Sequence, residues 1–260
     1  MVNRGMAQHT QDAARRYAPN VLVPGFGEAG QKRLAAARVL IVGLGGLGSP
    51  AAYYLAAAGV GTLGLMDPDA VNVSNLQRQI LYATADVGRS KTAAAAQTLA
   101  ALNPEVATEQ IGQQLTPANA PDLLMRFDVV VDASDNFDTK FLVNDACLEL
   151  GKPFATAGIL ALNGQALFVA PGRTACLRCA LPTVPQDAPT TAQLGVLGAV
   201  PGVLGSLEAL DVLRWLGGLW QASADGTGRL HALDGETMQL RTVRVPPRSD
   251  CRCAQLWNKT

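Results

Sequence analysis

The sequence carries no excess charge of either sign and no long apolar run. Its 260 residues include 21 Lys and Arg and 21 Asp and Glu, so the formal net charge is zero and nothing points to a nucleic-acid partner. No apolar stretch reaches the roughly 18 residues that a membrane span requires. The first residues contain no apolar signal-peptide core. We therefore expect a cytoplasmic protein without a membrane-spanning helix.

Histidine and cysteine are both scarce. The two histidines are His9 and His231, and the five cysteines are an odd number in a chain long enough to bury a core without disulfides. This pattern favours a reducing compartment in which thiols are buried or bound to metal. Cys147 falls within an expected helix and is predicted to be a buried apolar residue.

Four of the cysteines form two pairs about 70 residues apart. Cys176 and Cys179 have the C-x-x-C spacing of half a tetrahedral zinc site, whereas a single residue separates Cys251 from Cys253. If the end of the chain folds back, the two pairs complete one structural Zn²⁺ site. Free or disulfide-bonded cysteines are the alternative.

The most informative stretch is a glycine-rich loop between an expected strand and an expected helix. Residues 39–42 are apolar and mainly β-branched, which is typical of a buried strand, and residues 49–58 form an alanine-rich helix pattern. Between them lie the glycines of a G-x-G-x-x-G motif, with one extra: Gly43, Gly45, Gly46 and Gly48. Glycine allows a sharp turn and close approach of a phosphate to the backbone, and the helix N-terminus attracts anions. We predict a nucleotide site; a glycine turn kept for packing is the alternative.

Polar residues follow the next expected strand, at residues 62–66. Asp67 ends this strand about 20 residues after the glycine loop, where nucleotide-binding α/β folds place an acid on the ribose. Asn75 and Arg78 come shortly afterwards, and an arginine can hold phosphate oxygens with two N–H groups. A turn role for Asp67 and a solvated Arg78 are the simpler alternatives.

Two further groups suit a nucleotide site. Lys91 opens a helix that continues to Leu102, and beside a phosphate loop a lysine can act as a mobile positive charge. Asp132 and Asp135 follow a strong apolar strand pattern, and two carboxylates there suit Mg²⁺ held together with substrate phosphates. The alternative is N-capping of the helix that begins at Asn136, which would occupy one of the acids.

The alternation of strand and helix patterns predicts an α/β fold. We expect a doubly wound, Rossmann-like and mostly parallel sheet with a C-terminal antiparallel extension, closed by a hairpin of residues 230–233 and 239–245. An amphipathic helix is expected around Leu207. Residues 1–14 are predicted to be a mobile tail, and residues 15–260 a single domain.

Seven motifs together resemble those of the MoeB/ThiF adenylyltransferases, prokaryotic relatives of the ubiquitin-activating enzymes. They are RYAPNVLVPGFGEAGQ, GLGGLG, DPDAVNVSNLQRQ, VGRSK, DASDN, CLRC and GVLGSLEAL, and the likeness runs from about Arg16 to Cys253. SNLQRQ, DASDN and the paired cysteines are far more specific than the glycine loop. The resemblance implies ATP- and Mg²⁺-dependent adenylation of the C-terminal Gly-Gly carboxylate of a ubiquitin-like sulfur-carrier protein, giving carrier-AMP and pyrophosphate. It also implies a homodimer and a single ATP-binding domain with structural zinc.

The resemblance also implies roles for individual residues. The four loop glycines would line the ATP phosphates and adenosine, and Asp67 would hold the ribose hydroxyls. The triphosphate would be contacted by Asn75, Arg78 and Lys91, with Arg78 and Lys91 catalytic. Asp135 would bind Mg²⁺ and take part in catalysis, with Asn136 beside it at the nucleotide. The zinc ligands would be Cys176, Cys179, Cys251 and Cys253.

Three features depart from the family pattern. The usual R-Y-x-R-Q has Pro19 in place of its second arginine, which normally reaches ATP across the dimer, and we expect Arg15 or Arg16 to supply the missing charge. The last cysteine pair is C-x-C. Thr191 stands where some members carry a cysteine, so we expect no covalent enzyme–carrier intermediate and a separate persulfide donor.

Two other functions remain open at this point. The glycine loop and Asp67 alone would permit an NAD-dependent oxidoreductase, although Arg78, Lys91 and Asp135 better suit a triphosphate with metal. A non-catalytic nucleotide-binding relative of the same fold is allowed by Pro19. The sequence does not identify the carrier, whose pathway could be molybdopterin, thiamine, thiolated tRNA or a specialised metabolite.

Overall fold

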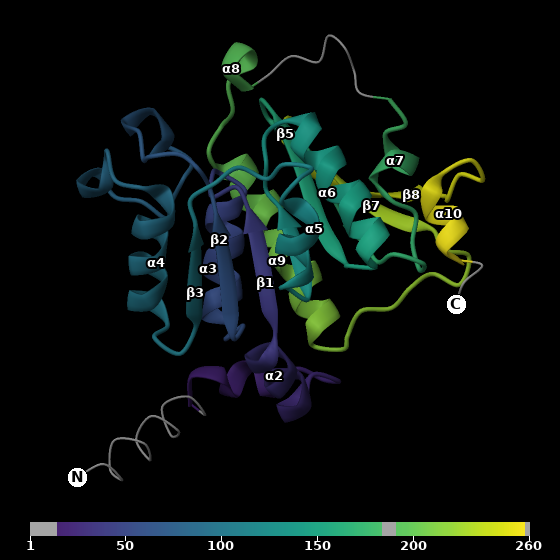
Figure 1. Cartoon of the computed structure of the whole chain (residues 1–260), viewed down its shortest axis with the longest axis horizontal. Coiled ribbons are helices and arrows are strands. Elements are labelled where there is room, and N and C mark those ends of the chain that lie inside the picture. The colour runs from purple at the N-terminus through teal and green to yellow at the C-terminus, as the bar shows by residue number, and fades with distance from the viewer. Residues whose placement is uncertain (1–14, 184–190, 258–260) are drawn as a thin grey trace.

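The computed structural model describes residues 15–183 and 191–257. The predicted tail at residues 1–14 therefore lies outside the described residues, as do residues 184–190 and 258–260. The described elements surround one large sheet, with the C-terminal ends of its parallel strands at the top of Figure 1. The helical residues 15–21 and α2 (Gly27–Ala36) lie at the opposite end.

Eight strands form this sheet in the order β3-β2-β1-β4-β5-β6-β7-β8. The first five in this order are parallel, and the last three are antiparallel to their neighbours. The doubly wound, mostly parallel sheet and its antiparallel extension are therefore confirmed. The strands are β1 (Arg38–Val42), β2 (Thr62–Met66), β3 (Ala107–Ile111), β4 (Val129–Asp132), β5 (Phe154–Leu160), β6 (Asn163–Val169), β7 (Gly228–Asp234) and β8 (Gln239–Val245).

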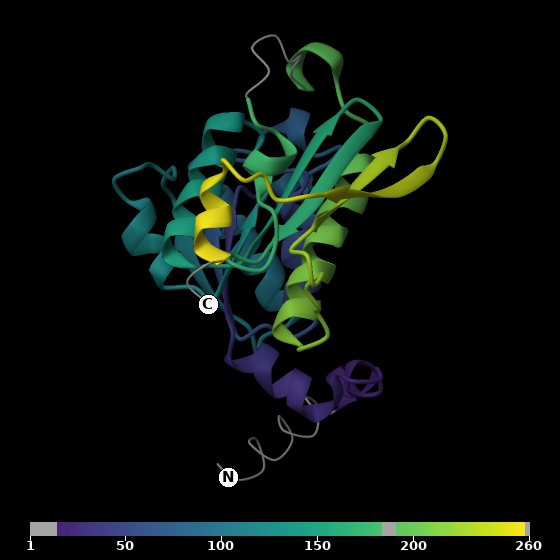
Figure 2. The same cartoon turned by 90° about the vertical axis from the view of Figure 1, so that its right-hand side faces the viewer.

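Helices cover both faces of the parallel part because its central strands are apolar on both sides. In β1, Val39 and Ile41 pack into a core with α3 (Gly48–Ala57), α4 (Lys91–Leu102) and α9 (Ala199–Leu216). Leu40 and Val42 pack into the other core with α5 (Ala120–Met125) and α6 (Phe137–Leu150). The β7–β8 hairpin extends beyond these helices at the side of the molecule (Figure 2).

Short helices link the antiparallel part to the rest. They are α7 (Leu177–Ala180), α8 (Thr191–Leu194) and α10 (Arg252–Trp257). Sequence patterns missed these, as well as α2 and α5. Proline and glycine interrupt the apolar period around α2, and α5 has only six residues, so neither gives a clear helical signal. The boundaries predicted for the other elements agree with the structure within two residues, as in α3, β7 and β8.

Candidate active site

The glycine loop after β1 requires two of its glycines for steric reasons. Gly43 has a φ of +91°, and a Cβ there would lie 2.8 Å from the carbonyl oxygen of Ala133. A Cβ on Gly48 would lie only 2.0 Å from the carbonyl oxygen of Gly43. The loop is thus packed directly against the DASDN segment after β4. We call the loops that follow β1, β2 and β4 the glycine-loop edge.

The middle glycines of the loop face polar side chains. A Cβ on Gly45 would have the amide nitrogen of Gln79 as its nearest neighbour, at 3.6 Å. A Cβ on Gly46 would lie 3.3 Å from the Cγ of Arg78, and 3.1 Å from Pro201 at the start of α9. The structure therefore brings the SNLQRQ segment, predicted to contact phosphates, onto the glycine loop.

Asp67 is tied to the same loop. Its carboxylate is buried and accepts a hydrogen bond from the backbone N–H of Leu44 at 2.9 Å and another from the backbone N–H of Asp69 at 2.9 Å. The hydroxyl of Tyr82 donates to the Leu44 carbonyl at 3.0 Å, and burial raises the pKa of this tyrosine, reinforced by the nearby Asp67 carboxylate. These contacts fix both peptide groups of Leu44 at the centre of the loop.

Lys91 does lie at this edge, at the first residue of α4, but it is not a solvated surface side chain. It is 5 % exposed, and its Nζ lies 2.8 Å from the Asp69 carboxylate and 3.4 Å from that of Asp67. The buried ammonium is paired, as a buried charge requires. Its position beside Asp67 places a positive charge next to the glycine loop.

Asn75 and Arg78 lie on a compact turn above β2. Asn75 ends the 3₁₀ turn η1 (Val73–Asn75), and the backbone N–H of Arg78 donates to its carbonyl at 3.1 Å. Among the residues that the structure describes, the guanidinium of Arg78 makes one hydrogen bond, to the Ser74 carbonyl at 3.2 Å. A guanidinium has five N–H donors, so most of them are free for a ligand.

The two acids of DASDN have different environments. Asp132 is fully buried and accepts hydrogen bonds from Thr156 at 2.7 Å and Ser134 at 2.5 Å, with Lys140 at 3.4 Å. Asp135 is exposed and makes no hydrogen bond or ion pair to any described residue. Only Asp135 is therefore free to bind a metal ion from solvent.

Neither Asp132 nor Asp135 caps helix α6. The side-chain oxygen of Asn136 accepts a hydrogen bond from the backbone N–H of Thr139 at 2.9 Å, so Asn136 is the N-cap of α6. Its oxygen is occupied, and its amide nitrogen makes no hydrogen bond to the described part of the chain. The alternative in which capping occupies one of the two acids is therefore wrong, because Asn136 caps the helix itself.

Sequence reasoning missed several buried polar residues at this edge. Lys140 and Thr156 complete the shell around Asp132, and Tyr82 lies against the glycine loop. The available sequence signal was Lys140, which lies one turn into the helix that follows Asp132. Thr156 is directly opposite Asp132 only because β4 and β5 pair in parallel.

Helix α9 holds the glycine loop from the other side. A Cβ on Gly205 would lie 2.1 Å from the Leu47 carbonyl oxygen, and one on Gly198 would lie 2.1 Å from that of Gln77. Such approaches are possible only for glycine. The start of α9 therefore packs on both the glycine loop and SNLQRQ.

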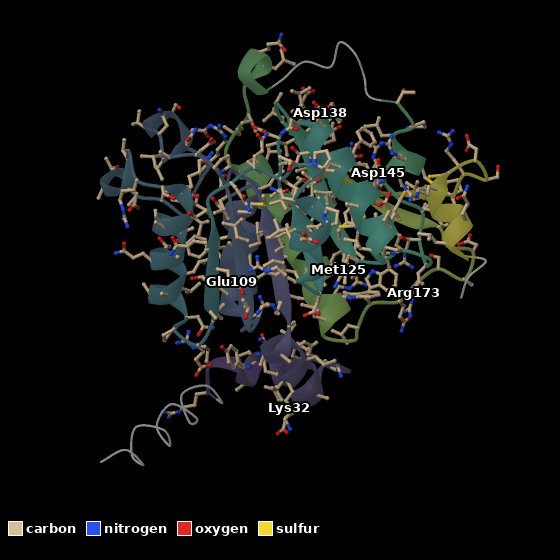
Figure 3. The ribbon with its side chains drawn as sticks, viewed as in Figure 1. Lys32, Glu109, Met125, Asp138, Asp145 and Arg173 are labelled. Atoms are coloured by element: carbon tan, nitrogen blue, oxygen red, sulfur yellow. The ribbon has the colours of Figure 1, made fainter. Side chains whose placement is uncertain are left out.

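Arg16 lies far from this edge within its own chain. Its guanidinium donates to the Leu102 carbonyl at 2.9 Å, at the end of α4 opposite to Lys91. Twelve helical residues place those two ends about 16 Å apart. In Figure 3, Lys32 on α2 marks this lower end and Asp138 on α6 marks the upper one. Within its own chain, Arg16 therefore does not supply the charge predicted beside the glycine loop.

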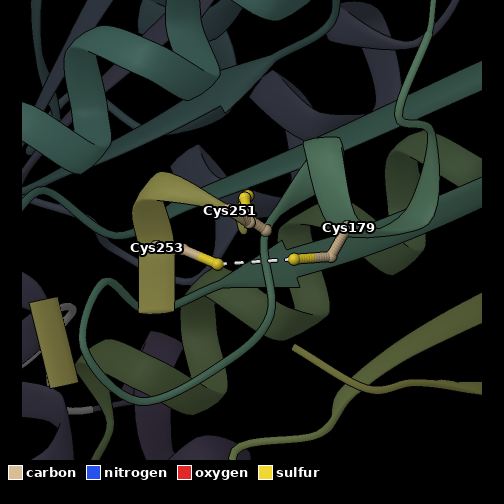
Figure 4. Close-up of side chains that lie close together, drawn as sticks. Cys179, Cys251 and Cys253 are labelled. Carbon is tan, nitrogen blue, oxygen red and sulfur yellow. Dashed lines mark hydrogen bonds between the residues drawn. The ribbon is translucent and has the colours of Figure 1, made fainter. Parts of the chain in front are cut away.

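The four paired cysteines come together as the sequence predicted. All are buried, and their sulfurs lie within 4.8 Å of one another, with 3.5 Å between Cys176 and Cys251 and 3.4 Å between Cys179 and Cys253 (Figure 4). A tetrahedral Zn²⁺ with bonds of about 2.3 Å needs sulfur–sulfur edges of about 3.8 Å. Hydrogen bonds among these thiols lower the pKa of Cys179 and raise that of Cys176. The donor set and spacing fit a four-thiolate metal site.

This cysteine cluster is anchored to α6. Arg178, between the two cysteines of C-x-x-C, makes paired hydrogen bonds to Asp145 at 2.7 and 2.6 Å, and the backbone N–H of Leu177 donates to Asn144 at 3.0 Å. Asp145 lies on the side of α6 that faces α7 (Figure 3). The same helix thus begins at Asn136 and supports the cluster at its middle.

None of the helices in the described parts of the chain is long and apolar enough to cross a membrane.

Comparisons with known proteins find relatives over most of the chain. The chain is 46% identical over 245 residues to the adenylyltransferase and sulfurtransferase MOCS3 of Bos taurus, covering 93% of this chain and 53% of that one. It is 44% identical over 246 residues to the sulfur carrier protein adenylyltransferase of Thermus thermophilus, covering 92% and 90%. The chain thus spans about half the length of the MOCS3 relatives it matches.

Solved structures show the same fold. A structure of Escherichia coli MccB with AMPCPP and selenomethionine MccA has a TM-score of 0.77 at 23% identity, covering 92% of this chain and 74% of that one. A structure of MccB with ATP has a TM-score of 0.73 at 24% identity, covering 86% and 68%. The profile of the ThiF family matches residues 17–254, nearly the whole described chain. The chain belongs to the ThiF family.

Proposed function

We propose that the protein adenylates the C-terminal Gly-Gly carboxylate of a ubiquitin-like sulfur-carrier protein, consuming ATP and releasing pyrophosphate. The observation that carries this proposal is the convergence of the glycine loop, Arg78, Lys91 and Asp135 on one sheet edge. The MOCS3 relative is an adenylyltransferase and sulfurtransferase and the Thermus relative is a sulfur carrier protein adenylyltransferase, which supports the same reaction.

The residues at this edge suit a reaction governed by positioning and charge. The loop glycines and the start of α3 would receive the phosphates, and Asp67 would hold the ribose. Arg78, and Lys91 turned away from Asp69, would balance charge on the departing pyrophosphate. The carrier carboxylate is already a nucleophile, so no general base is required.

Mg²⁺ would neutralise phosphate charge when bound. Asp135 is the residue we propose to hold it, because this carboxylate is exposed, has no described partner and follows β4 beside the glycine loop. Asn136 would present its free amide nitrogen to the nucleotide. Asp132 would not serve, since its oxygens are occupied by Thr156 and Ser134.

The cysteine cluster is proposed to bind one structural Zn²⁺ through Cys176, Cys179, Cys251 and Cys253. The fit of the four sulfurs supports this, and the C-x-C pair is accommodated because α10 begins between Cys251 and Cys253. The cluster is fully buried, so it would stabilise the antiparallel part rather than take part in the reaction.

The remaining proposals concern partners. We infer a homodimer, in which Arg15 or Arg16 of one copy would approach the triphosphate of the other in place of the arginine missing at Pro19. Exposed apolar side chains on α9, Val203 and Leu210, support such an interface. Sulfur would come from a separate persulfide donor, because the described cysteines are all buried.

The test is exchange of labelled pyrophosphate into ATP in the presence of candidate carriers ending in Gly-Gly. Carrier-dependent exchange is the expected result. Absence of exchange with every carrier, combined with ATP binding, would favour a non-catalytic relative. Binding of NADH without ATP binding would favour an oxidoreductase.

A further inference from the structure

A small pocket lies between the C-terminal half of α9 and strands β6 and β7. Phe168 on β6, which lines this pocket, pairs with Ala155 at the start of β5, so the pocket is at the end of the sheet away from the glycine loop. Asp211, another lining residue, lies about 18 Å along α9 from the first residue of that helix. Arg173, whose guanidinium lies over the neighbouring Trp215, is labelled at the lower right of Figure 3. The pocket is therefore separate from the proposed nucleotide site.

The size of the pocket limits what it can hold. Its volume is about 30 Å³. A single water molecule needs roughly 10–15 Å³ of such space, so there is room for about two water-sized atoms. Aromatic rings close one side: the ring centroids of Phe168 and Trp220 are 5.6 Å apart, and that of Trp215 lies 5.1 Å from Trp220. A nucleotide is far too large, but the oxygens of a small ion fit, with the rest of the ion at the mouth.

The residues around the pocket carry more positive than negative charge. The acid among them, Asp211, is 7 % exposed and accepts a hydrogen bond from the guanidinium of Arg214 at 2.9 Å. Burial raises the pKa of Asp211, and three basic neighbours oppose this rise: His231, Arg214 and Arg229. Because Arg214 balances the charge of Asp211, the positive charge of Arg229 is left without a counter-charge.

Arg229 on β7 is also part of an unfavourable cross-strand pair. It lies directly opposite Arg244 in the β7–β8 register, and like charges in that arrangement destabilise a sheet. Arg244 makes an ion pair with Asp225 at 2.7 Å, whereas the side chain of Arg229 makes no hydrogen bond or ion pair to any described residue. An anion bound beside Arg229 would relieve this repulsion.

His231, two residues further along the same face of β7, has one ring nitrogen available. Its Nδ1 lies 3.2 Å from the hydroxyl oxygen of Thr242, the residue opposite to it on β8. When this hydroxyl donates to Nδ1, the neutral ring carries its proton on Nε2, and the protonated ring carries one there as well. Ser223 adds a hydroxyl from the segment that follows α9. The pocket thus offers a guanidinium, an imidazole N–H and a hydroxyl, none with an acceptor among the described residues.

We propose that this pocket binds a small tetrahedral oxyanion, of the phosphate or sulfate type, between Arg229, His231 and Ser223. Hydrogen bonds from a charged donor to an oxyanion are shorter and stronger than those between neutral groups. Two of these residues belong to β7 and the third follows α9, so the ion would join the antiparallel part of the sheet to that helix. The proposal does not depend on the use of ATP, because the pocket and the glycine-loop edge lie at opposite ends of the sheet.

The experiment titrates phosphate at fixed pH and ionic strength and follows the imidazole signals of His231 by NMR. The chain contains two histidines, so in a His9→Gln background the remaining signals belong to His231. We expect a saturable shift with a dissociation constant of about 1 mM, also given by sulfate and absent with chloride. Phosphate bound at the glycine loop would not move these signals, because that loop is at the other end of the sheet.

Variants at Arg229 test the charged donor. Arg229→Gln should weaken phosphate binding about tenfold, as for loss of one hydrogen bond to a charged group, and Arg229→Lys should lose less because it keeps the charge. Without phosphate, the melting temperature of Arg229→Gln should not be lower than that of the wild type, since a like-charge pair is removed. The matched control is Arg241→Gln, an exposed arginine on the opposite face of β8 whose guanidinium donates to Gln239, and it should bind phosphate as the wild type does.

Signals of His231 that do not move with phosphate, or that move equally with chloride, would overturn the proposal. Equal phosphate affinity in Arg229→Gln and the wild type would overturn it as well. Tighter binding of glycerol 3-phosphate than of phosphate would support the site and identify a phosphate ester as its ligand. Tighter binding of inorganic phosphate would support it and identify the free ion.

Discussion

The glycine-loop edge and the cysteine cluster use their polar groups in opposite ways. At the edge, Asp135 is exposed without a described partner, and the side-chain oxygen of Gln79 is buried without one. In the cluster, every thiol is buried and its sulfur lies within 4.8 Å of the other three sulfurs. Unpaired groups cost stability and are retained where a ligand completes them, whereas mutually satisfied groups hold the fold together. The comparison separates binding residues from structural ones.

The largest effect is expected at Asp135. Asp135→Ala should lower carrier-dependent pyrophosphate exchange about a thousandfold, on the order of 4 kcal/mol, because it removes the group proposed to hold Mg²⁺. Its melting temperature should be unchanged, since the side chain has no described partner. Asp138→Ala, an exposed acid in the first turn of α6, is the matched control and should retain exchange. Near-normal exchange in Asp135→Ala would remove this residue from the mechanism.

The second-largest effect is expected at the cysteine cluster. Cys179→Ser should lower the free energy of unfolding by about 3 kcal/mol, because one metal ligand is lost from a buried site. Elemental analysis of the wild-type protein should give one zinc per chain, and prolonged chelation should lower its melting temperature. A metal-free protein of unchanged stability would contradict the structural role.

A smaller effect is expected at Glu208 on α9. Like the polar groups at the glycine-loop edge, its carboxylate has no hydrogen-bond partner in the described chain. Neither carboxylate oxygen has a partner in the described chain, and burial raises the pKa of Glu208 well above its usual range. Lys140 opposes this shift, while Asp132 and Asp211 add to it. Glu208 should therefore be protonated in the folded protein at a pH where it is ionised in the unfolded chain.

The sign of the resulting pH dependence follows from this difference. Below about pH 4.5 both states hold the proton, and Glu208 contributes no pH dependence. As pH rises toward the raised folded pKa, the stability should fall by about 1.4 kcal/mol per pH unit. Glu208→Gln should match the wild type near pH 4.5 and become increasingly more stable than it at higher pH, measured by denaturant unfolding. Glu236→Gln, at an exposed turn, is the control and should show no such divergence.

The smallest expected effect concerns Cys147, a buried thiol outside the cluster. Burial raises its pKa, so little nucleophilic thiolate forms at neutral pH. Cys147→Ala should leave the exchange rate unchanged. Mass spectrometry of enzyme, carrier and ATP should show carrier-AMP and no enzyme–carrier conjugate. A thiol-sensitive conjugate of the summed mass would instead indicate a covalent step.

Local patterns were sufficient for much of the fold and for the position of the site. The apolar strand before Gly43, the alanine-rich helix after it and the polar residues that end β2 and β4 all lie where they were expected. Each depends on neighbours in sequence, such as side-chain periodicity or the steric freedom of glycine. Helices α2 and α5 were missed because proline, glycine or short length weakens the same periodicity.

The sequence alone determined which residues are chemically suited to nucleotide and metal, since residue type and strand-end position are local properties. Only the tertiary structure decided how these residues are used. Lys91 is buried because Asp67 and Asp69 lie beside it, and Asp132 is occupied because parallel pairing brings Thr156 opposite to it. The two cysteine pairs meet because the chain returns across about 70 residues. The burial and the hydrogen-bond partners of a residue depend on contacts that are distant in sequence, so they cannot be predicted from periodicity and spacing.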